Sequence, residues 1–323
     1  MHRKLAWIAR SHGRWSWQHP EQDAGVDHEL LAAQEALIAR DAPGTRIRRV
    51  RWSQGETQVL EIGTGPPLLL VHGGLSSAVE WFPVLQLLAR SHRVLALDRP
   101  GHGLADSYDY SGVDLFDHAT TFLRDMVDAL QLRTVDVVAN SMGGLWSAVF
   151  ALREPMRVSR LILAGAPAGL KRKVPPQLRV LGLPGFGAVL GRQLMSHWTR
   201  ERCRKFWGQI LVANPQLLDD TLLDAVLVNA RRNMKSHLSF IGSVLDAGGL
   251  RRPLILGERW QEIRTPTACL WGDCDAFSRP EEGEALAARN PNLRIVRVPG
   301  AGHLPWIDEP ELVVAEIERF LVS

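Results

Sequence analysis

Residues 134–153, TVDVVANSMGGLWSAVFALR, decide the fold of this chain. The apolar run at 134–138 is typical of a buried strand, and residues 144–153 have the pattern of a helix. Between them, Ala139-Asn140-Ser141-Met142-Gly143 sets a serine among small residues, the pattern of a nucleophile elbow with alanine in the first glycine position. Small residues are needed because the turn is sharp. The stretch therefore predicts a serine hydroxyl that stands clear of the sheet and faces a pocket.

Two later segments offer partners for this serine. Gly272-Asp273-Cys274-Asp275 follows an apolar run at 267–271, and Gly300-Ala301-Gly302-His303 follows another at 293–298. A serine hydroxyl is a poor nucleophile at neutral pH, so it needs a base that is oriented by an acid. We expect His303 to be the base and Asp275 the acid, because Asp275 lies further out on its loop. Asp273 is the alternative, although we expect it to cap its own turn.

An oxyanion needs backbone donors placed around it. We expect one donor to be the N–H of Met142, at the start of a helix. The other comes from the loop His72-Gly73-Gly74-Leu75, where Gly74 is the first choice and Leu75 the second. His72 is expected to hold this loop by hydrogen bonding. The sequence thus predicts a complete site for acyl transfer.

The substrate pocket is predicted from residues adjacent in sequence to these groups. Leu75, Trp81, Trp146 and Trp306 are the candidates, since they neighbour the oxyanion loop, the elbow and the base. For the three tryptophans, packing in the core explains the pattern equally well.

Short apolar runs alternate with helical patterns along most of the chain. The runs at 68–72, 94–97, 135–139 and 161–164 suit strands that are covered on both faces, which indicates a parallel sheet. We expect an α/β fold with a doubly wound, mostly parallel sheet and an inserted helical lid. The expected divisions are an N-terminal arm and helix (1–45), a first core part (46–169), the helical lid (170–263) and a second core part (264–323).

Composition limits the possible partners. The chain has 323 residues, 46% of them hydrophobic and 23% charged, with a net charge of +3. Basic runs such as Lys171-Arg172-Lys173 are interpreted as solvated helix faces, and no basic stripe indicates nucleic acid. The cysteines, Cys203, Cys269 and Cys274, are widely spaced and expected to be reduced thiols, so we expect a cytoplasmic protein. No apolar stretch suits a transmembrane helix.

The first residues form an arm rich in tryptophan, histidine and arginine. Trp7, Trp15 and Trp17 stand among basic residues before the first acid, Glu21. We interpret the arm as a surface segment. The alternative is that its tryptophans contact a lipid interface or a second chain. The sequence leaves the oligomeric state open.

Five motifs together resemble the α/β-hydrolase superfamily: LLLVHGG, ALDRPGHGLAD, VVANSMGG, LWGDCDAF and GAGHLPWIDEP, which extend over nearly all of residues 46–323. The resemblance implies a triad of Ser141, Asp275 and His303, a lid and no cofactor, in the chain order of that fold. It argues against haloalkane dehalogenases and epoxide hydrolases, which carry Asp at the elbow. The Asn-Ser-Met-Gly-Gly elbow is similar to that of the meta-cleavage-product hydrolases, but Gly73-Gly74-Leu75 and Leu304 depart from their pattern.

These expectations lead to a serine hydrolase that cleaves a small, moderately hydrophobic carboxylic ester. The alternative is carbon–carbon bond hydrolysis of meta-cleavage type, for which Arg200, Arg202 or Arg204 in the lid would hold a substrate carboxylate. An alternative of another class is a receptor-like ligand-binding protein of the same fold with slow turnover.

Overall fold

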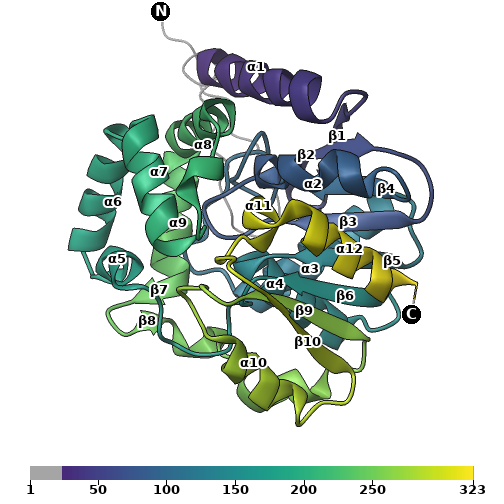
Figure 1. Ribbon diagram of the computed structural model, residues 1–323. Coiled ribbons are helices and arrows are strands. Elements are labelled where there is room, and N and C mark those ends of the chain that lie inside the picture. Colours follow the sequence, from purple (N-terminus) through teal and green to yellow (C-terminus); the bar gives the residue numbers. More distant parts are fainter. Residues whose placement is uncertain (1–23, 323) are drawn as a thin grey trace, which may run out of the picture.

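An eight-stranded, mostly parallel sheet forms the centre of the computed structural model, which describes residues 24–322 (Figure 1). The strand order is β1-β2-β4-β3-β5-β6-β9-β10. The β1–β2 and β2–β4 pairs are antiparallel and all other neighbours are parallel. The predicted α/β fold is therefore confirmed. The strands are β1 (Arg46–Trp52), β2 (Gly55–Ile62), β3 (Pro67–Val71), β4 (Arg93–Leu97), β5 (Val135–Ala139), β6 (Val158–Ala164), β9 (Thr267–Gly272) and β10 (Leu293–Val298).

The central strands are buried on both faces, as their continuous apolar sequences require. β6 begins three residues before the expected apolar run at 161–164. The strand begins with residues that face solvent, since Ser159 is exposed and Arg160 is half-buried. These polar residues interrupt the apolar pattern, so the sequence did not indicate the start of the strand. The parallel strands end at one edge of the sheet, where ligands bind in open α/β folds.

Helices cover both faces of the sheet (Figure 1). One face carries α3 and α4, whose apolar residues join the core with β5 and β6, and α10. The other carries α2, α11 and α12, which pack with β3 and β4 around a second core. The helices around the sheet are α2 (Phe82–Leu88), α3 (Leu115–Ala129), α4 (Ser141–Arg153), α10 (Pro280–Ala287), α11 (Pro305–Asp308) and α12 (Pro310–Leu321), with the 3-10 helix η1 (Ala78–Trp81) before α2.

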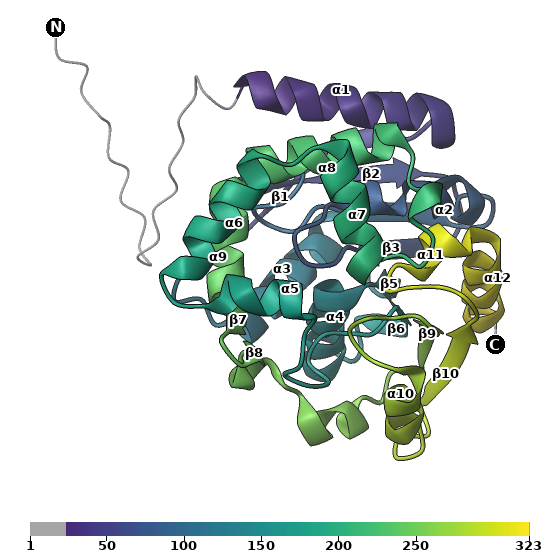
Figure 2. The ribbon, with the colours of Figure 1, turned by 60° about the vertical axis from the view of Figure 1, so that its left-hand side comes forward.

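A group of helices between β6 and β9 stands over the carboxyl edge of the sheet (Figure 2). We call residues 170–263 the lid. We expected this segment to be helical, but Leu245–Asp246 (β7) and Gly249–Leu250 (β8) form a two-stranded ribbon within it. Strands this short leave no apolar run for a sequence to reveal. The lid helices are α5 (Pro176–Arg179), α6 (Phe186–Ser196), α7 (Arg200–Ile210), α8 (Asp220–Arg232) and α9 (Met234–Val244), with the 3-10 helices η2 (Val180–Gly182), η3 (Pro215–Leu217), η4 (Arg252–Leu254) and η5 (Gly257–Glu262).

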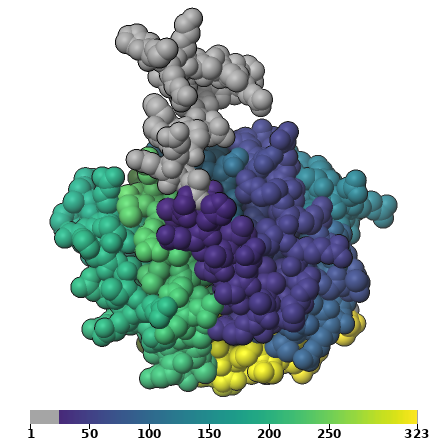
Figure 3. Space-filling view, turned by 90° about the horizontal axis from the view of Figure 1, so that it is seen from above, coloured from purple at the N-terminus to yellow at the C-terminus, as the bar shows by residue number. Residues whose placement is uncertain are grey.

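The helix α1 (Ala24–Asp41) lies across the boundary between the lid and the core (Figure 3). It packs on α8 of the lid and α2 of the core. Arg40 of α1 binds Asp219 at 2.7 Å, and Arg232 of α8 pairs with Asp27. These ion pairs are partly solvated, so each contributes about 1 kcal/mol or less to stability. The apolar contacts of α1 with α8 and α2 therefore contribute most of the stability of its packing. The arm before α1, with Trp7, Trp15 and Trp17, lies outside the described residues.

Candidate active site

The elbow between β5 and α4 holds Ser141 in a strained conformation. Its φ is +50°, in the left-handed region that non-glycine residues rarely adopt. The flanking glycines explain how the turn fits. A Cβ on Gly143 would lie 2.4 Å from the carbonyl oxygens of Val71 and His72, and one on Gly144 would lie 3.2 Å from Leu163. The small residues in the elbow are therefore a steric requirement of this turn.

His303 and Asp275 meet below the lid. The Nδ1 of His303 lies 2.8 Å from Oδ2 of Asp275, and both side chains are buried. Asp275 also accepts hydrogen bonds from the N–H groups of Ala166 and Phe277, at 2.9 and 2.8 Å. Because the carboxylate has three fixed partners, it orients the imidazole. The alternative acid, Asp273, is exposed to solvent.

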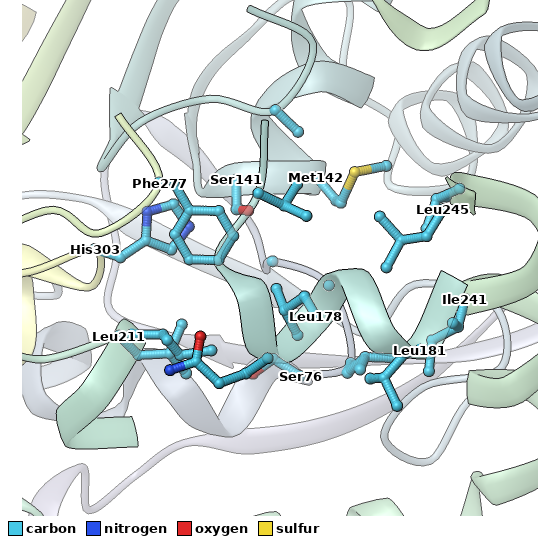
Figure 4. Close-up of a pocket in the computed structure, with 18 of the residues that line it drawn as sticks. Ser76, Ser141, Met142, Leu178, Leu181, Leu211, Ile241, Leu245, Phe277 and His303 are labelled. Carbon is cyan, nitrogen blue, oxygen red and sulfur yellow. The ribbon is translucent and has the colours of Figure 1, made fainter. Parts of the chain in front are cut away.

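The other side of the imidazole faces the cavity. Nε2 of His303 has no hydrogen-bond partner among the described residues. The ring of Phe277 stacks on it, with centroids 3.9 Å apart. Figure 4 shows His303 and Phe277 beside Ser141 at one end of the cavity. This arrangement leaves Nε2 available to exchange a proton with a group bound near the serine.

Asn140, the residue before the serine, links the elbow to the histidine loop. Its buried Nδ2 donates to the carbonyl oxygens of Ala164 and His303, at 2.7 and 3.1 Å. A Cβ on Gly165 would lie 2.1 Å from that same carbonyl of His303. These contacts hold the elbow, the end of β6 and the backbone of His303 together. The sequence showed Asn140 only as part of the elbow pattern, because its partners lie on distant segments.

The loop after β3 is tied down on several sides. Nδ1 of His72 donates to the carbonyl of Gly73 at 2.8 Å, and its Nε2 accepts from the N–H of Arg99 at 2.9 Å. Burial lowers the pKa of His72 well below its usual value, so it is neutral and structural. Gly74, Leu75 and Met142 all line the cavity beside Ser141. The first-turn N–H of Met142 has no acceptor within its helix, which suits it to an oxyanion.

Two buried charged groups under this loop did not stand out in the sequence. Glu80 lines the cavity, and its Oε1 accepts from the N–H of Gly73 at 3.1 Å. Burial raises the pKa of Glu80 to about 7. Arg99 is fully buried, donates to the carbonyl of Gly73 at 2.6 Å, and lies over the rings of Trp146 and Phe240. The only indication of Glu80 in the sequence was the presence of an acidic residue within the otherwise apolar run at 78–82.

The cavity has a volume of about 240 Å³ and lies between the sheet edge and the lid. Its walls are mostly apolar, and the far end from Ser141 is formed by Ile241 and Leu245 (Figure 4). The tryptophans that line it, Trp198 and Trp207, come from the lid. Its cationic side chains among the described residues are Lys171, which pairs with Glu282, and the exposed Lys173.

Of the two alternatives for Trp81, Trp146 and Trp306, the structure favours core packing, since none of them lines the cavity, whereas Leu75 does line it. Trp81 and Trp306 stack on each other in the core, with centroids 4.1 Å apart, and Trp146 is buried against Arg99. Successive residues of a helix point to different sides, so a neighbour in sequence of a site residue need not face the site.

The arginines considered for a substrate carboxylate lie elsewhere. Arg200 pairs with Asp220 and Asp224, Arg204 pairs with Asp220, and Arg202 binds a backbone carbonyl. None of the three is among the residues that line the cavity. Within residues 24–322, no group of three or more His, Cys, Asp or Glu side chains is arranged to hold a metal ion.

Comparison with known proteins identifies the family of the chain. Residues 68–316 match the model of the Alpha/beta hydrolase family, more than half of the chain. The chain belongs to the alpha/beta hydrolase family. Accordingly, this α/β hydrolase is an enzyme.

Two relatives of this α/β hydrolase share the name 2-hydroxy-6-oxononadienedioate/2-hydroxy-6-oxononatrienedioate hydrolase. The protein of Paraburkholderia xenovorans is 29% identical over 81% of this chain and 90% of its own length. That of Escherichia coli K12 is 31% identical over 68% of this chain and 74% of its own.

Solved structures show the same fold. The carboxylesterase CesB from Bacillus subtilis has a TM-score of 0.69 at 19% identity and covers 92% of this chain and 98% of its own. The epoxide hydrolase CorEH has a TM-score of 0.72 at 20% identity, with 86% and 99% covered. At such identities the likeness indicates the fold of this hydrolase and leaves its substrate open. No helix within the described residues is long and apolar enough to cross a membrane.

Proposed function

We propose that this α/β hydrolase cleaves a small, moderately hydrophobic carboxylic ester through an acyl-enzyme on Ser141. The observation that carries the proposal is the His303–Asp275 contact of 2.8 Å, with Nε2 of His303 unpartnered toward the cavity that Ser141 also lines. An imidazole that is oriented by a carboxylate and has its other nitrogen free toward the serine's cavity is what a base for Ser141 requires.

The reaction follows from the positions of these groups. Oγ of Ser141 attacks the ester carbonyl carbon while Nε2 of His303 takes the hydroxyl proton. The negative charge that develops on the carbonyl oxygen is stabilised by the N–H groups of Gly74 and Met142. The C–O bond to the alcohol then breaks, and the alcohol leaves with the proton from His303. Water, deprotonated by His303, attacks the acyl-enzyme and releases the acid.

The lining of the cavity favours an uncharged substrate. His237 faces the cavity, and burial lowers its pKa to about 3, so it is neutral. Glu80 adds partial negative charge near neutral pH. Of the two cationic lining residues, Lys171 is already paired. A dianion would lose its hydration there without gaining a buried cation, and that is costly.

Carbon–carbon bond hydrolysis is the second candidate, because the relatives named above are hydrolases of dienedioates at about 30% identity. It uses the same serine, base and oxyanion donors. The apolar lining and the outward position of Arg200, Arg202 and Arg204 favour the ester.

The test is hydrolysis of a chain-length series of p-nitrophenyl esters, with a 2-hydroxy-6-oxo-dienedioate assayed in parallel. Ser141→Ala should lower ester turnover by several orders of magnitude. Ser147→Ala is the matched control, because Ser147 lies on the same helix, is buried, and does not line the cavity. Retained ester turnover in Ser141→Ala, or dienedioate turnover without ester turnover in the wild type, would overturn the proposal.

A further inference from the structure

The outer side of the lid exposes a cluster of large apolar side chains. Within residues 24–322, nine large apolar side chains are exposed, and five of them fall between positions 180 and 194. Phe186 is 55% exposed and Val189 is 65% exposed. This is a concentration of exposed apolar side chains along one short segment of the lid, and exposed apolar patches on folded proteins mark interaction sites. We call this cluster the lid patch: Val180, Leu183, Phe186, Val189 and Leu194.

The segment that carries the lid patch is basic in sequence. Residues 170–199 contain five lysines and arginines and no aspartate or glutamate. Lys171 and Arg172 pair with acids on other segments, Glu282 and Asp246. Arg179 and Arg192 are exposed and make no ion pair among the described residues. Apolar side chains flanked by arginine and lysine are the composition of segments that lie on anionic membranes.

The lid patch is joined to the cavity through α6. Gly191, Leu194 and Met195 of α6 line the cavity, and Leu194 is at the same time 45% exposed. The helix therefore presents one side to the cavity and another to solvent, at the outer side of the molecule (Figure 2). A ligand that covers the patch therefore contacts a helix that also forms part of the cavity wall.

We propose that the lid patch docks on the surface of a bilayer that contains anionic phospholipid. Phe186 and Val189 enter the headgroup boundary while Arg179 and Arg192 bind lipid phosphates. Since no described helix is long and apolar enough to cross a membrane, the attachment is peripheral. This last step rests on the proposed function: docking would deliver apolar esters from the lipid into the cavity.

The test is co-sedimentation of the full chain with vesicles of phosphatidylcholine mixed with phosphatidylglycerol, and with vesicles of phosphatidylcholine alone. Phe186→Ser combined with Val189→Ser should weaken binding to the mixed vesicles by about tenfold, because two apolar side chains no longer leave water. Arg179→Gln combined with Arg192→Gln should have an effect of similar size, and added salt should reproduce it.

The matched control is Met156→Ser combined with Val322→Ser. These residues are 82% and 83% exposed and lie outside the lid, so binding should equal that of the wild type. Absence of wild-type binding to the mixed vesicles, or equal loss in the control, would overturn the proposal. A patch variant that changed the mass in solution of a wild-type oligomer, without changing vesicle binding, would assign the patch to a protein interface and also overturn it.

Failure of this proposal is distinguishable from failure of the ester hydrolysis. None of the four substituted lid residues lines the cavity, so hydrolysis of a water-soluble p-nitrophenyl ester should be unchanged in both lid variants. Ser141→Ala should bind vesicles like the wild type. A loss of soluble-ester turnover that accompanied the loss of vesicle binding would show lid damage and refute the assignment of the patch to docking.

Discussion

Glu80 gives the most quantitative prediction, because a carboxyl group is buried beside the oxyanion loop. Its Oε1 accepts the N–H of Gly73, and its backbone carbonyl accepts Nε1 of Trp306 at 2.7 Å. Burial raises its pKa from 4.5 to about 7 in the folded chain. Replacement by glutamine keeps the size and an oxygen that can accept from Gly73, and removes the ionisation.

The expected magnitude follows from linkage. Below pH 4.5 the carboxyl is protonated in both the folded and the unfolded chain, and its ionisation costs nothing. Between pH 4.5 and 7 only the unfolded chain releases the proton, so wild-type stability falls as pH rises. At about 1.4 kcal/mol per pH unit, the rise of the Glu80 pKa from 4.5 to about 7 gives a loss of about 3 kcal/mol that is complete above pH 7.

The assay is urea denaturation of wild type and Glu80→Gln from pH 4.5 to 8, followed by tryptophan fluorescence. The free energy of unfolding of the variant minus that of the wild type should increase by about 3 kcal/mol across this range. Glu311→Gln, which removes an exposed carboxyl on α12, controls for the loss of one negative charge. Parallel stability curves for wild type and Glu80→Gln would refute the burial argument.

Three further substitutions test the site. Asp275→Asn should lower ester kcat by about 10⁴, as expected when the base loses its orienting acid; an effect below tenfold would contradict the assignment. Asn140→Ala leaves two carbonyl oxygens without this partner and should cost about 2–4 kcal/mol in urea denaturation; an unchanged midpoint would contradict it. Gly165→Ala should displace the backbone of His303 and lower kcat more than Gly112→Ala, a surface glycine with positive φ and open space; equal effects would refute this.

Local sequence was sufficient for the sheet and the elbow. The runs at 68–72, 94–97 and 135–139 correspond to β3, β4 and β5, because strands buried on both faces need continuous apolar residues. β7 and β8 were missed, since two residues carry no period. The elbow was predictable because a sharp turn at φ +50° for Ser141 demands small neighbours that a short motif records.

The pocket and its electrostatics could not be predicted in this way. Trp306 seemed a pocket residue by its position near His303, yet it stacks on Trp81 in the core, while Trp198 and Trp207 of the lid line the cavity. Arg200 and its neighbours looked available for a substrate, but they pair with acids on α8. Which side of a helix faces the site depends on packing with elements far along the chain.

The sequence by itself determined the order of strands and helices, the serine in its turn, and the candidate base and acid, because each depends on a few adjacent residues. Only the tertiary structure decided that Glu80 is buried with a raised pKa, that the lid covers an apolar cavity, and that Leu194 belongs both to the lid patch and to the cavity wall. The physical reason is that burial and pKa depend on neighbours in space. Glu80 and Trp306, hydrogen-bonded across 226 positions, illustrate the distances in sequence over which such neighbours are brought together.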